Sequence, residues 1–137
     1  VAGNEHSTVV EPVDKLGFKP EQIVIEFGYD GDVDEDFRQS VEAAVASELE
    51  DEAYDGVVDA VLLWWRDGEG DLTDELVDAL TMLEEGGFIV LVTPGRGRSD
   101  RIEAHVVQEA CTTSGLTASG AVPLSPEWHA QRLVGRK

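Results

Sequence analysis

Two apolar runs separated by one helical pattern constrain this chain more than any other feature. Residues 60–65 (Ala-Val-Leu-Leu-Trp-Trp) and 88–92 (Phe-Ile-Val-Leu-Val) are apolar at every position. Between them, large apolar residues recur at helical spacing, at Leu72, Leu76, Val77, Leu80 and Leu83. Strands that are apolar on both faces are buried on both faces, and a parallel pair needs a crossover helix between its strands. The sequence therefore predicts an α/β, Rossmann-like domain with three layers.

The predicted sheet is mainly parallel and has about five strands. We expect neighbours in the order 23–27, 57–65, 88–93 and then an antiparallel C-terminal pair, drawn from residues 116–124 and 129–134. A helix over 72–85, ended by Gly86 and Gly87, makes a right-handed crossover. Residues 16–137 form this single domain, and residues 1–15 are expected to be a flexible tail.

Two further helices are predicted from apolar spacing. The first is marked by Phe37, Val41, Ala44, Val45 and Leu49, after an acidic N-terminus that suits the helix dipole. The second is marked by Ile102, Val106, Ala110 and Thr113. We expect it to be entered through Ser99 and Asp100 and closed by Gly115.

Composition limits the classes of partner. The 137 residues include 29 acidic and 10 basic ones, a formal net charge of -19. Such a charge argues against nucleic acid and anionic membrane as partners, because both are polyanions. It fits a solubilising acidic surface, a halophile-like composition, or attraction to a basic protein. The single cysteine, Cys111, allows no intramolecular disulfide and is expected to be a buried apolar residue. Without a membrane-spanning run or a signal-peptide pattern, a cytoplasmic location is expected.

Two segments resemble class I S-adenosylmethionine-dependent methyltransferases. Residues 26–32 (Glu-Phe-Gly-Tyr-Asp-Gly-Asp) resemble their Glu-x-Gly-x-Gly-x-Gly loop, and residues 83–92 resemble the segment that leads through two glycines into a strand. Residues 55–67 more closely resemble a small actinobacterial family catalogued as domain of unknown function 3052, and that resemblance runs from about Leu16 to the C-terminus. It implies a methyltransferase-like fold but no mechanism, cofactor or catalytic residue.

Departures from the methyltransferase pattern affect the cofactor site that the resemblance would imply. Only Gly28 matches the glycine loop, while Asp30 and Asp32 replace the next two glycines. A βαβ extension needs ~30 residues, yet about eight residues, 48–55, separate the first helix from the middle strand. The strand whose acidic residue would hold the adenosine ribose is therefore absent. We expect no bound cofactor and a non-catalytic role in protein or small-ligand binding; the alternative is an enzyme or sensor that binds a nucleotide or S-adenosylmethionine at the strand ends.

Candidate ligand-binding residues gather at the predicted carboxyl ends of the strands. They are Gly28, Asp30, Asp32, Arg66, Arg96, Arg98 and Arg101. The three arginines of residues 96–101 lie among glycines ahead of a helix, which suits a phosphate or carboxylate ligand; they could instead neutralise the facing acidic loops.

Carboxylates alternate along one loop, at Asp30, Asp32, Asp34 and Asp36, and could wrap a divalent cation. The calcium-loop template fails, however, because Glu35 stands at its glycine position. We therefore expect a solvated loop with helix-capping carboxylates and assign no metal site. Trp64 and Trp65 should cover opposite faces of the sheet, mainly as core, with a stacking platform beside Arg66 as the alternative. No nucleophile or general base can be nominated.

Overall fold

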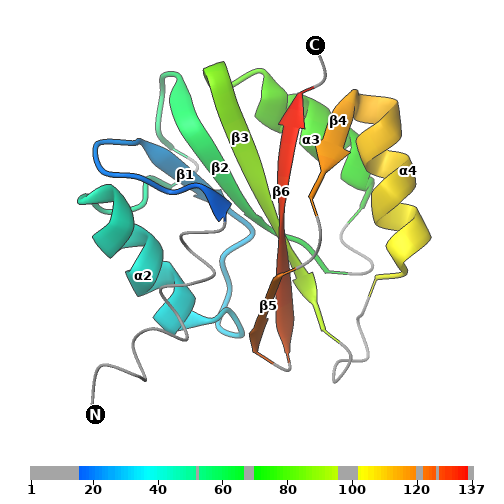
Figure 1. Cartoon of the computed structure of the whole chain (residues 1–137), viewed down its shortest axis with the longest axis horizontal. Helices are drawn as coiled ribbons and strands as arrows, with labels where there is room; N and C mark the ends of the chain where they lie inside the picture. Colours follow the sequence, from blue (N-terminus) through cyan, green and yellow to red (C-terminus); the bar gives the residue numbers. More distant parts are fainter. Residues whose placement is uncertain are drawn as a thin grey trace.

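A six-stranded sheet with helices on both faces organises the chain. The computed structural model describes residues 16–51, 53–66, 70–95, 102–119, 122–125 and 127–135. Along the chain these form β1 (Val24–Phe27), α2 (Glu35–Val45), β2 (Val58–Trp64), α3 (Leu72–Leu80), β3 (Leu83–Pro94), α4 (Ala104–Ser114), β4 (Leu116–Ala118), β5 (Val122–Ser125) and β6 (Trp128–Gly135). Figure 1 shows α2 on one side of the sheet and α3 and α4 on the other.

The predicted strand order is confirmed. The order is β1-β2-β3-β6-β4, with β5 also paired to β6. β1, β2 and β3 are parallel, and Ile25 lies opposite Val61 in the register. β6 runs antiparallel to β3 and to β4 and β5, which pair with it in succession. The C-terminal strands therefore do not form a simple edge pair, because β6 lies inside the sheet.

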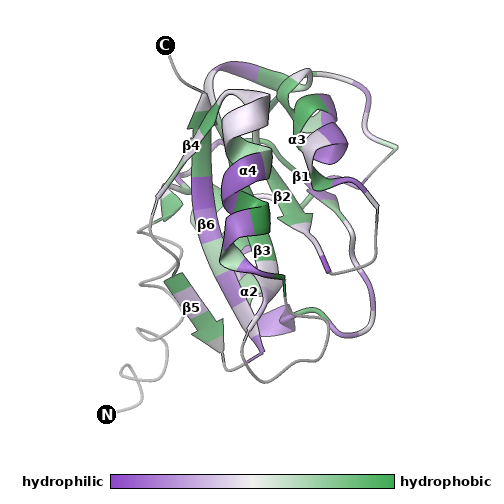
Figure 2. Ribbon diagram, turned by 90° about the vertical axis from the view of Figure 1, so that its right-hand side faces the viewer, coloured by the Kyte–Doolittle hydropathy of each residue, from purple (hydrophilic) through white to green (hydrophobic). Residues whose placement is uncertain are grey.

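The three parallel strands are buried on both faces, as their continuous apolar sequences predict. One core cluster contains Trp64 with residues of α2, and the other contains Trp65 with residues of α3 and α4. The two tryptophans thus cover opposite faces, as predicted. Figure 2 shows the hydrophobic colour of β2 behind the outward-facing helices α3 and α4. Cys111 is buried in the second cluster, also as predicted.

The crossover helix ends earlier than predicted. α3 stops at Leu80, and Leu83 already pairs with Val58 of β2. Leu83 continues the apolar spacing of the helix but belongs to β3. A prediction based on helical spacing alone therefore extended the helix too far. Gly87 does not end a helix; a Cβ there would lie 2.8 Å from the carbonyl oxygen of Asp59, so the position needs glycine for close approach of two strands.

Two other helix boundaries differ from the prediction. α2 ends at Val45 because Ala46 adopts a left-handed conformation (φ 64°), so Leu49 packs against the core from outside the helix. α4 begins after Glu103, so Ile102 precedes the helix instead of belonging to it, while the predicted entry at Ser99 and Asp100 lies outside the described residues. It buries Val107 rather than Val106, which is 40% exposed, while Gly115 closes the helix as predicted.

The outer edge of β1 is closed by a single bridge instead of another strand. The Glu26 amide donates to the carbonyl of Glu50 (2.8 Å), and the Glu50 amide donates to the carbonyl of Val24 (2.9 Å). These two bonds satisfy backbone groups that an edge strand would expose. Of the described residues in the short 48–55 connection, Glu50 alone pairs with β1. No helix in the described part of the chain is long and apolar enough to cross a membrane.

Candidate functional site

Three of the predicted site residues meet where β1 and β2 end. The Arg66 guanidinium donates to both carboxylate oxygens of Asp32, with Nε to Oδ2 at 3.0 Å and Nη2 to Oδ1 at 2.6 Å, and its Nη1 donates to the Gly28 carbonyl at 3.1 Å. Arg66 is only 8% exposed, although it is charged. A bidentate pair of this kind fixes both side chains in one geometry. The carboxyl ends of β1 and β2 are thus joined by an internal ion pair.

Trp128 completes this cluster from the far end of the chain. Its indole N–H donates to the Asp32 carbonyl at 3.0 Å, and the Arg66 guanidinium lies 5.2 Å from the centre of its ring. Trp128 is 1% exposed and packs edge-on against Trp64, with ring centres 5.0 Å apart. Arg66 thus lies against the ring of Trp128, the first residue of β6. We call Gly28, Asp32, Arg66 and Trp128 the strand-end cluster.

Gly28 serves the packing of β1 against β2. Its φ is 81°, and a Cβ at this position would lie 2.2 Å from the Trp64 carbonyl oxygen, which excludes any side chain. The glycine that matches the methyltransferase loop thus brings two protein backbones together.

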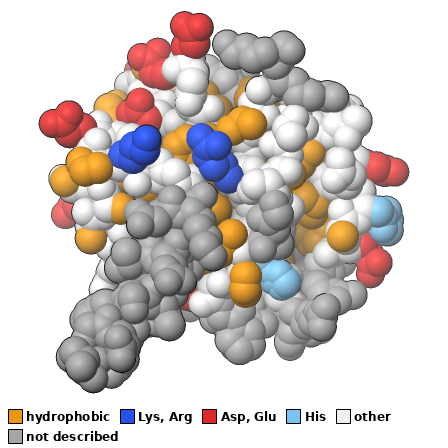
Figure 3. Space-filling model, in the orientation of Figure 1, with side chains coloured by type: hydrophobic (Ala, Val, Ile, Leu, Met, Phe, Trp, Pro, Cys, Tyr) orange, Lys and Arg blue, Asp and Glu red, His pale blue; other side chains and the backbone are white. Residues whose placement is uncertain are grey.

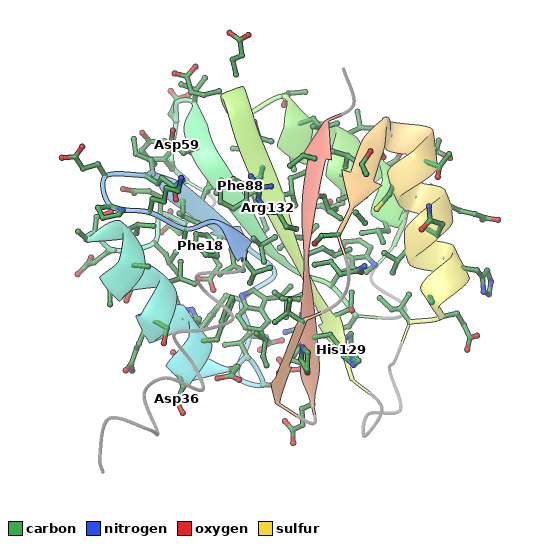
Figure 4. The ribbon with its side chains drawn as sticks, viewed as in Figure 1. Phe18, Asp36, Asp59, Phe88, His129 and Arg132 are labelled. Atoms are coloured by element: carbon green, nitrogen blue, oxygen red, sulfur yellow. The ribbon has the colours of Figure 1, made fainter. Side chains whose placement is uncertain are left out.

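The other acidic residues of the loop have separate local roles. Asp30 accepts from the neighbouring Gly31 amide (2.8 Å), and Asp34 caps α2 by accepting from the Phe37 amide (3.0 Å). Asp36 lies in the first turn of α2 and is exposed (Figure 4). Among the described residues, no group of three or more His, Cys, Asp and Glu side chains could hold a metal ion.

A second polar network surrounds Glu26, which is 7% exposed. Its carboxylate accepts from the indole N–H of Trp64 (2.8 Å) and from Nε and Nη2 of Arg38 (2.7 Å each). Arg38 continues outward to Glu35 (2.8 Å), which also accepts from the Tyr29 hydroxyl (3.0 Å). The hydrogen bond from Arg38, and next that from Tyr29, lowers the pKa of Glu35. Glu26 is the acidic residue that begins the methyltransferase-like loop, and both of its carboxylate oxygens therefore accept hydrogen bonds from side chains of this protein.

A cavity of about 450 Å³ lies farther along the same edge of the sheet. Thr93 and Pro94 at the end of β3, the start of α4 from Ile102, and His129 and Gln131 of β6 line it. Figure 4 shows His129 where β5 and β6 lie beside the end of β3. Arg96, Arg98 and Arg101 belong to the connection between Pro94 and Ile102 but lie outside the described residues, so their predicted role stays a prediction.

Sequence reasoning grouped Gly28, Asp32 and Arg66 correctly, since adjacent parallel strands end at the same edge of a sheet. It missed Trp128, because β6 returns to the middle of the sheet through a long-range antiparallel pairing that local patterns do not encode. It also missed Arg38 as the partner of Glu26. The spacing of twelve residues from β1 into α2 gives no local signal for that contact.

This strand order, with helices on both faces of the sheet, defines a methyltransferase-like Rossmann domain. Among solved structures, the chain is similar to the N,N-8-amino-8-demethyl-D-riboflavin dimethyltransferase of Streptomyces davawensis (TM-score 0.67, 11% identity, 95% of this chain and 53% of that one). It is also similar to the precorrin-6y C5,15-methyltransferase of Geobacter metallireducens (TM-score 0.64, 8% identity, 93% and 87%). Identities this low establish the fold alone.

The family follows from sequence. The profile described as "Protein of unknown function (DUF3052)" matches residues 13–137, and the chain belongs to that family. The protein named "Uncharacterized protein Rv2239c" of Mycobacterium tuberculosis is 46% identical over 123 residues, which cover 90% of this chain and 77% of the relative. This relative comes from an actinobacterium, in agreement with the resemblance found in the sequence.

Proposed function

We propose that this protein is a non-catalytic methyltransferase-like domain that acts by binding a protein or a small ligand. The strand-end cluster carries the proposal. Ligands of Rossmann-like folds sit beyond the carboxyl ends of the strands, and at the ends of β1 and β2 that place holds the Asp32–Arg66 pair against the ring of Trp128.

A cofactor at this place would have to displace charged groups that already satisfy one another. Separating Arg66 from Asp32 would leave a guanidinium of 8% exposure without its carboxylate, which is costly in a partly buried site. The Asp32 and Asp30 side chains add negative charge where glycines would leave room. Both features work against binding of S-adenosylmethionine.

The closed edge of β1 supports the same proposal. A ribose-binding carboxylate would come from a strand next to β1, but within the described part of the chain only Glu50 pairs at that edge, through its backbone. The 48–55 connection is too short for the missing strand and helix.

Isothermal titration calorimetry with S-adenosylmethionine tests the proposal. We expect no saturable heat at millimolar cofactor, and the same result with S-adenosylhomocysteine. Micromolar binding of either compound would refute it. A parallel titration of R66A shows whether the ion pair alone is the obstacle; we expect R66A to remain without binding, because the neighbouring strand is also missing.

A second candidate function is binding of a small anionic ligand such as a nucleotide. The cavity of about 450 Å³ at the end of β3 favours it, because Pro94 and Ile102, which lie close to the two ends of the arginine-rich connection, both line that cavity. A thermal-shift screen of nucleotides tests it, with the R96A/R98A double variant as the control. A ligand site predicts a nucleotide shift that the variant loses while its own melting temperature is kept. If the arginines only neutralise acidic loops, no nucleotide shifts the parent protein, and the variant loses stability in a salt-dependent way.

A further inference from the structure

A groove of about 320 Å³ runs beside α3 on the face of the sheet that carries the second core cluster. Phe27 of β1, Leu63 of β2 and Met82 after α3 give it an apolar lining. Glu75 and Asp78 of α3 also line it and bring carboxylates to it. The groove therefore joins an apolar surface to an acidic one.

The groove exists because α3 covers only the inner part of this sheet face. Phe27 and Leu63 are direct neighbours in the register of β1 and β2, yet Leu63 is 1% exposed while Phe27 stays half-buried at the edge strand. In the sheet interior, a parallel strand of this kind is covered by a helix on each face. The groove extends from Glu75 in the first turn of α3 to Met82 beyond its end, roughly 10 Å at 1.5 Å per residue. That length accommodates about two turns of a helix lying beside α3.

Charge decides what can occupy the groove. Glu75 and Asp78 are three residues apart and so lie on one side of α3. The whole chain carries a net charge of -19, which repels a second copy and any acidic partner. Figure 3 shows acidic side chains around the outline of the molecule as well. A partner that is apolar on one face and basic beside it matches both the lining and the charge.

We propose that this groove binds an amphipathic helix of a partner protein, with its apolar face on Phe27 and Met82, above the buried Leu63, and its Lys or Arg side chains beside Glu75 and Asp78. The proposal names the kind of partner for the binding role proposed above and rests on it. Packing of an apolar helix face in a groove is a common mode of peptide recognition, and the carboxylates select basic sequences.

Fluorescence anisotropy with a labelled helical peptide of leucine and lysine tests the proposal. The lysines lie on one face and the leucines on the other. We expect saturable binding to the parent protein and at least tenfold weaker binding to D78K, whose altered side chain is exposed. E109K makes the same change of charge at an exposed position of α4, outside the groove, and should weaken binding no more than twofold.

Two results would overturn the groove as the site. One is equal weakening by D78K and E109K, and the other is equal binding of a peptide whose leucines are replaced by serine; both would mean attraction to net charge alone. Methyl NMR locates the contact directly, since the peptide should shift the signals of Leu63 and Met82. Shifts confined to Val106, in the hollow between α3 and α4, would refute the proposal. So would the finding, by sedimentation, that the protein is a dimer and remains one when the peptide is added.

The test is independent of cofactor binding. If S-adenosylmethionine binds while the peptide result is as expected, the non-catalytic assignment fails and the groove stands. If neither binds, the groove is refuted while the non-catalytic assignment stands.

Discussion

The Glu26 network offers the sharpest test of how the strand ends are held. In R38M, Glu26 loses two charge-assisted hydrogen bonds of 2.7 Å and keeps only the Trp64 indole, in a site where its side chain is 6% exposed and that of Arg38 is 21% exposed. A hydrogen bond to a charged group contributes ~1.5–3 kcal/mol. Because Arg38 is partly exposed, we take the low end and expect a loss of about 3 kcal/mol in unfolding free energy. For a domain of this size, that lowers the melting temperature by roughly 10 °C.

Urea unfolding of four proteins measures the effect: parent, R38M, E26Q and the double variant E26Q/R38M. The glutamine keeps an acceptor for the Trp64 indole but removes the charge that needs Arg38. We therefore expect R38M to cost much less in the E26Q background, since no buried carboxylate is then left unpaired. E35Q is the matched control, because it neutralises the exposed carboxylate that binds Arg38 and the Tyr29 hydroxyl while leaving the Glu26–Arg38 pair in place, so its cost should be far smaller. An equal cost of R38M in both backgrounds, or a cost no larger than that of E35Q, would refute the reasoning.

Three other substitutions or titrations have definite expected outcomes. G28A should lower the unfolding free energy by roughly 3 kcal/mol through backbone strain and a close contact, because the new Cβ would lie 2.2 Å from the Trp64 carbonyl oxygen. G31A is the control and should be neutral, because a Cβ at Gly31 meets nothing within 4 Å. Similar losses in the two variants would contradict this explanation. Burial raises the pKa of the Cys111 thiol, so the native state favours the protonated form; this stabilisation is complete below the thiol's unfolded pKa and is lost as pH rises through the folded value. Unfolding at pH 7–10 should show that decline in the parent and not in C111A. R132M removes a buried Nε that has no hydrogen-bond partner among the described residues (Figure 4). Its unfolding free energy in urea should therefore equal that of the parent or exceed it by ~1 kcal/mol. A clear loss would show that the contact of Arg132 with the Phe88 ring contributes more.

The sheet was predictable because its strands are buried on both faces and leave continuous apolar runs. Periodicity was less reliable at helix ends, where one residue can satisfy two patterns. Leu83 fits the helical spacing of α3, but its backbone pairs with Val58. Val106 and Val107 are adjacent apolar residues in α4, so spacing alone could not decide which one faces the core; the structure buries Val107.

Contacts within the site were predictable only where topology fixes them. The ends of parallel neighbours coincide, and this put Asp32 and Arg66 at one edge of the sheet, although their ion pair itself was not predicted. The contact of Trp128 with Asp32 spans 96 residues and depends on the return of β6 to the middle of the sheet. Nothing in the sequence near Trp128 marks that position, since its role follows from a pairing that forms only in the folded chain.

Trp64 gives the methyltransferase-like residues of this loop a structural role that needs no cofactor. Glu26 accepts its indole N–H, and Gly28 lies against its backbone carbonyl, so the two residues that match the loop both face the end of β2. Phe37 and Trp128 pack edge-on against the same indole. These contacts constrain the identities of Glu26 and Gly28 through the stability of the fold alone. We expect R38M and G28A to lose stability while S-adenosylmethionine does not bind. In that case Glu26 and Gly28 serve the packing of β1 against β2, and their presence in a relative is not by itself a sign of methyl transfer.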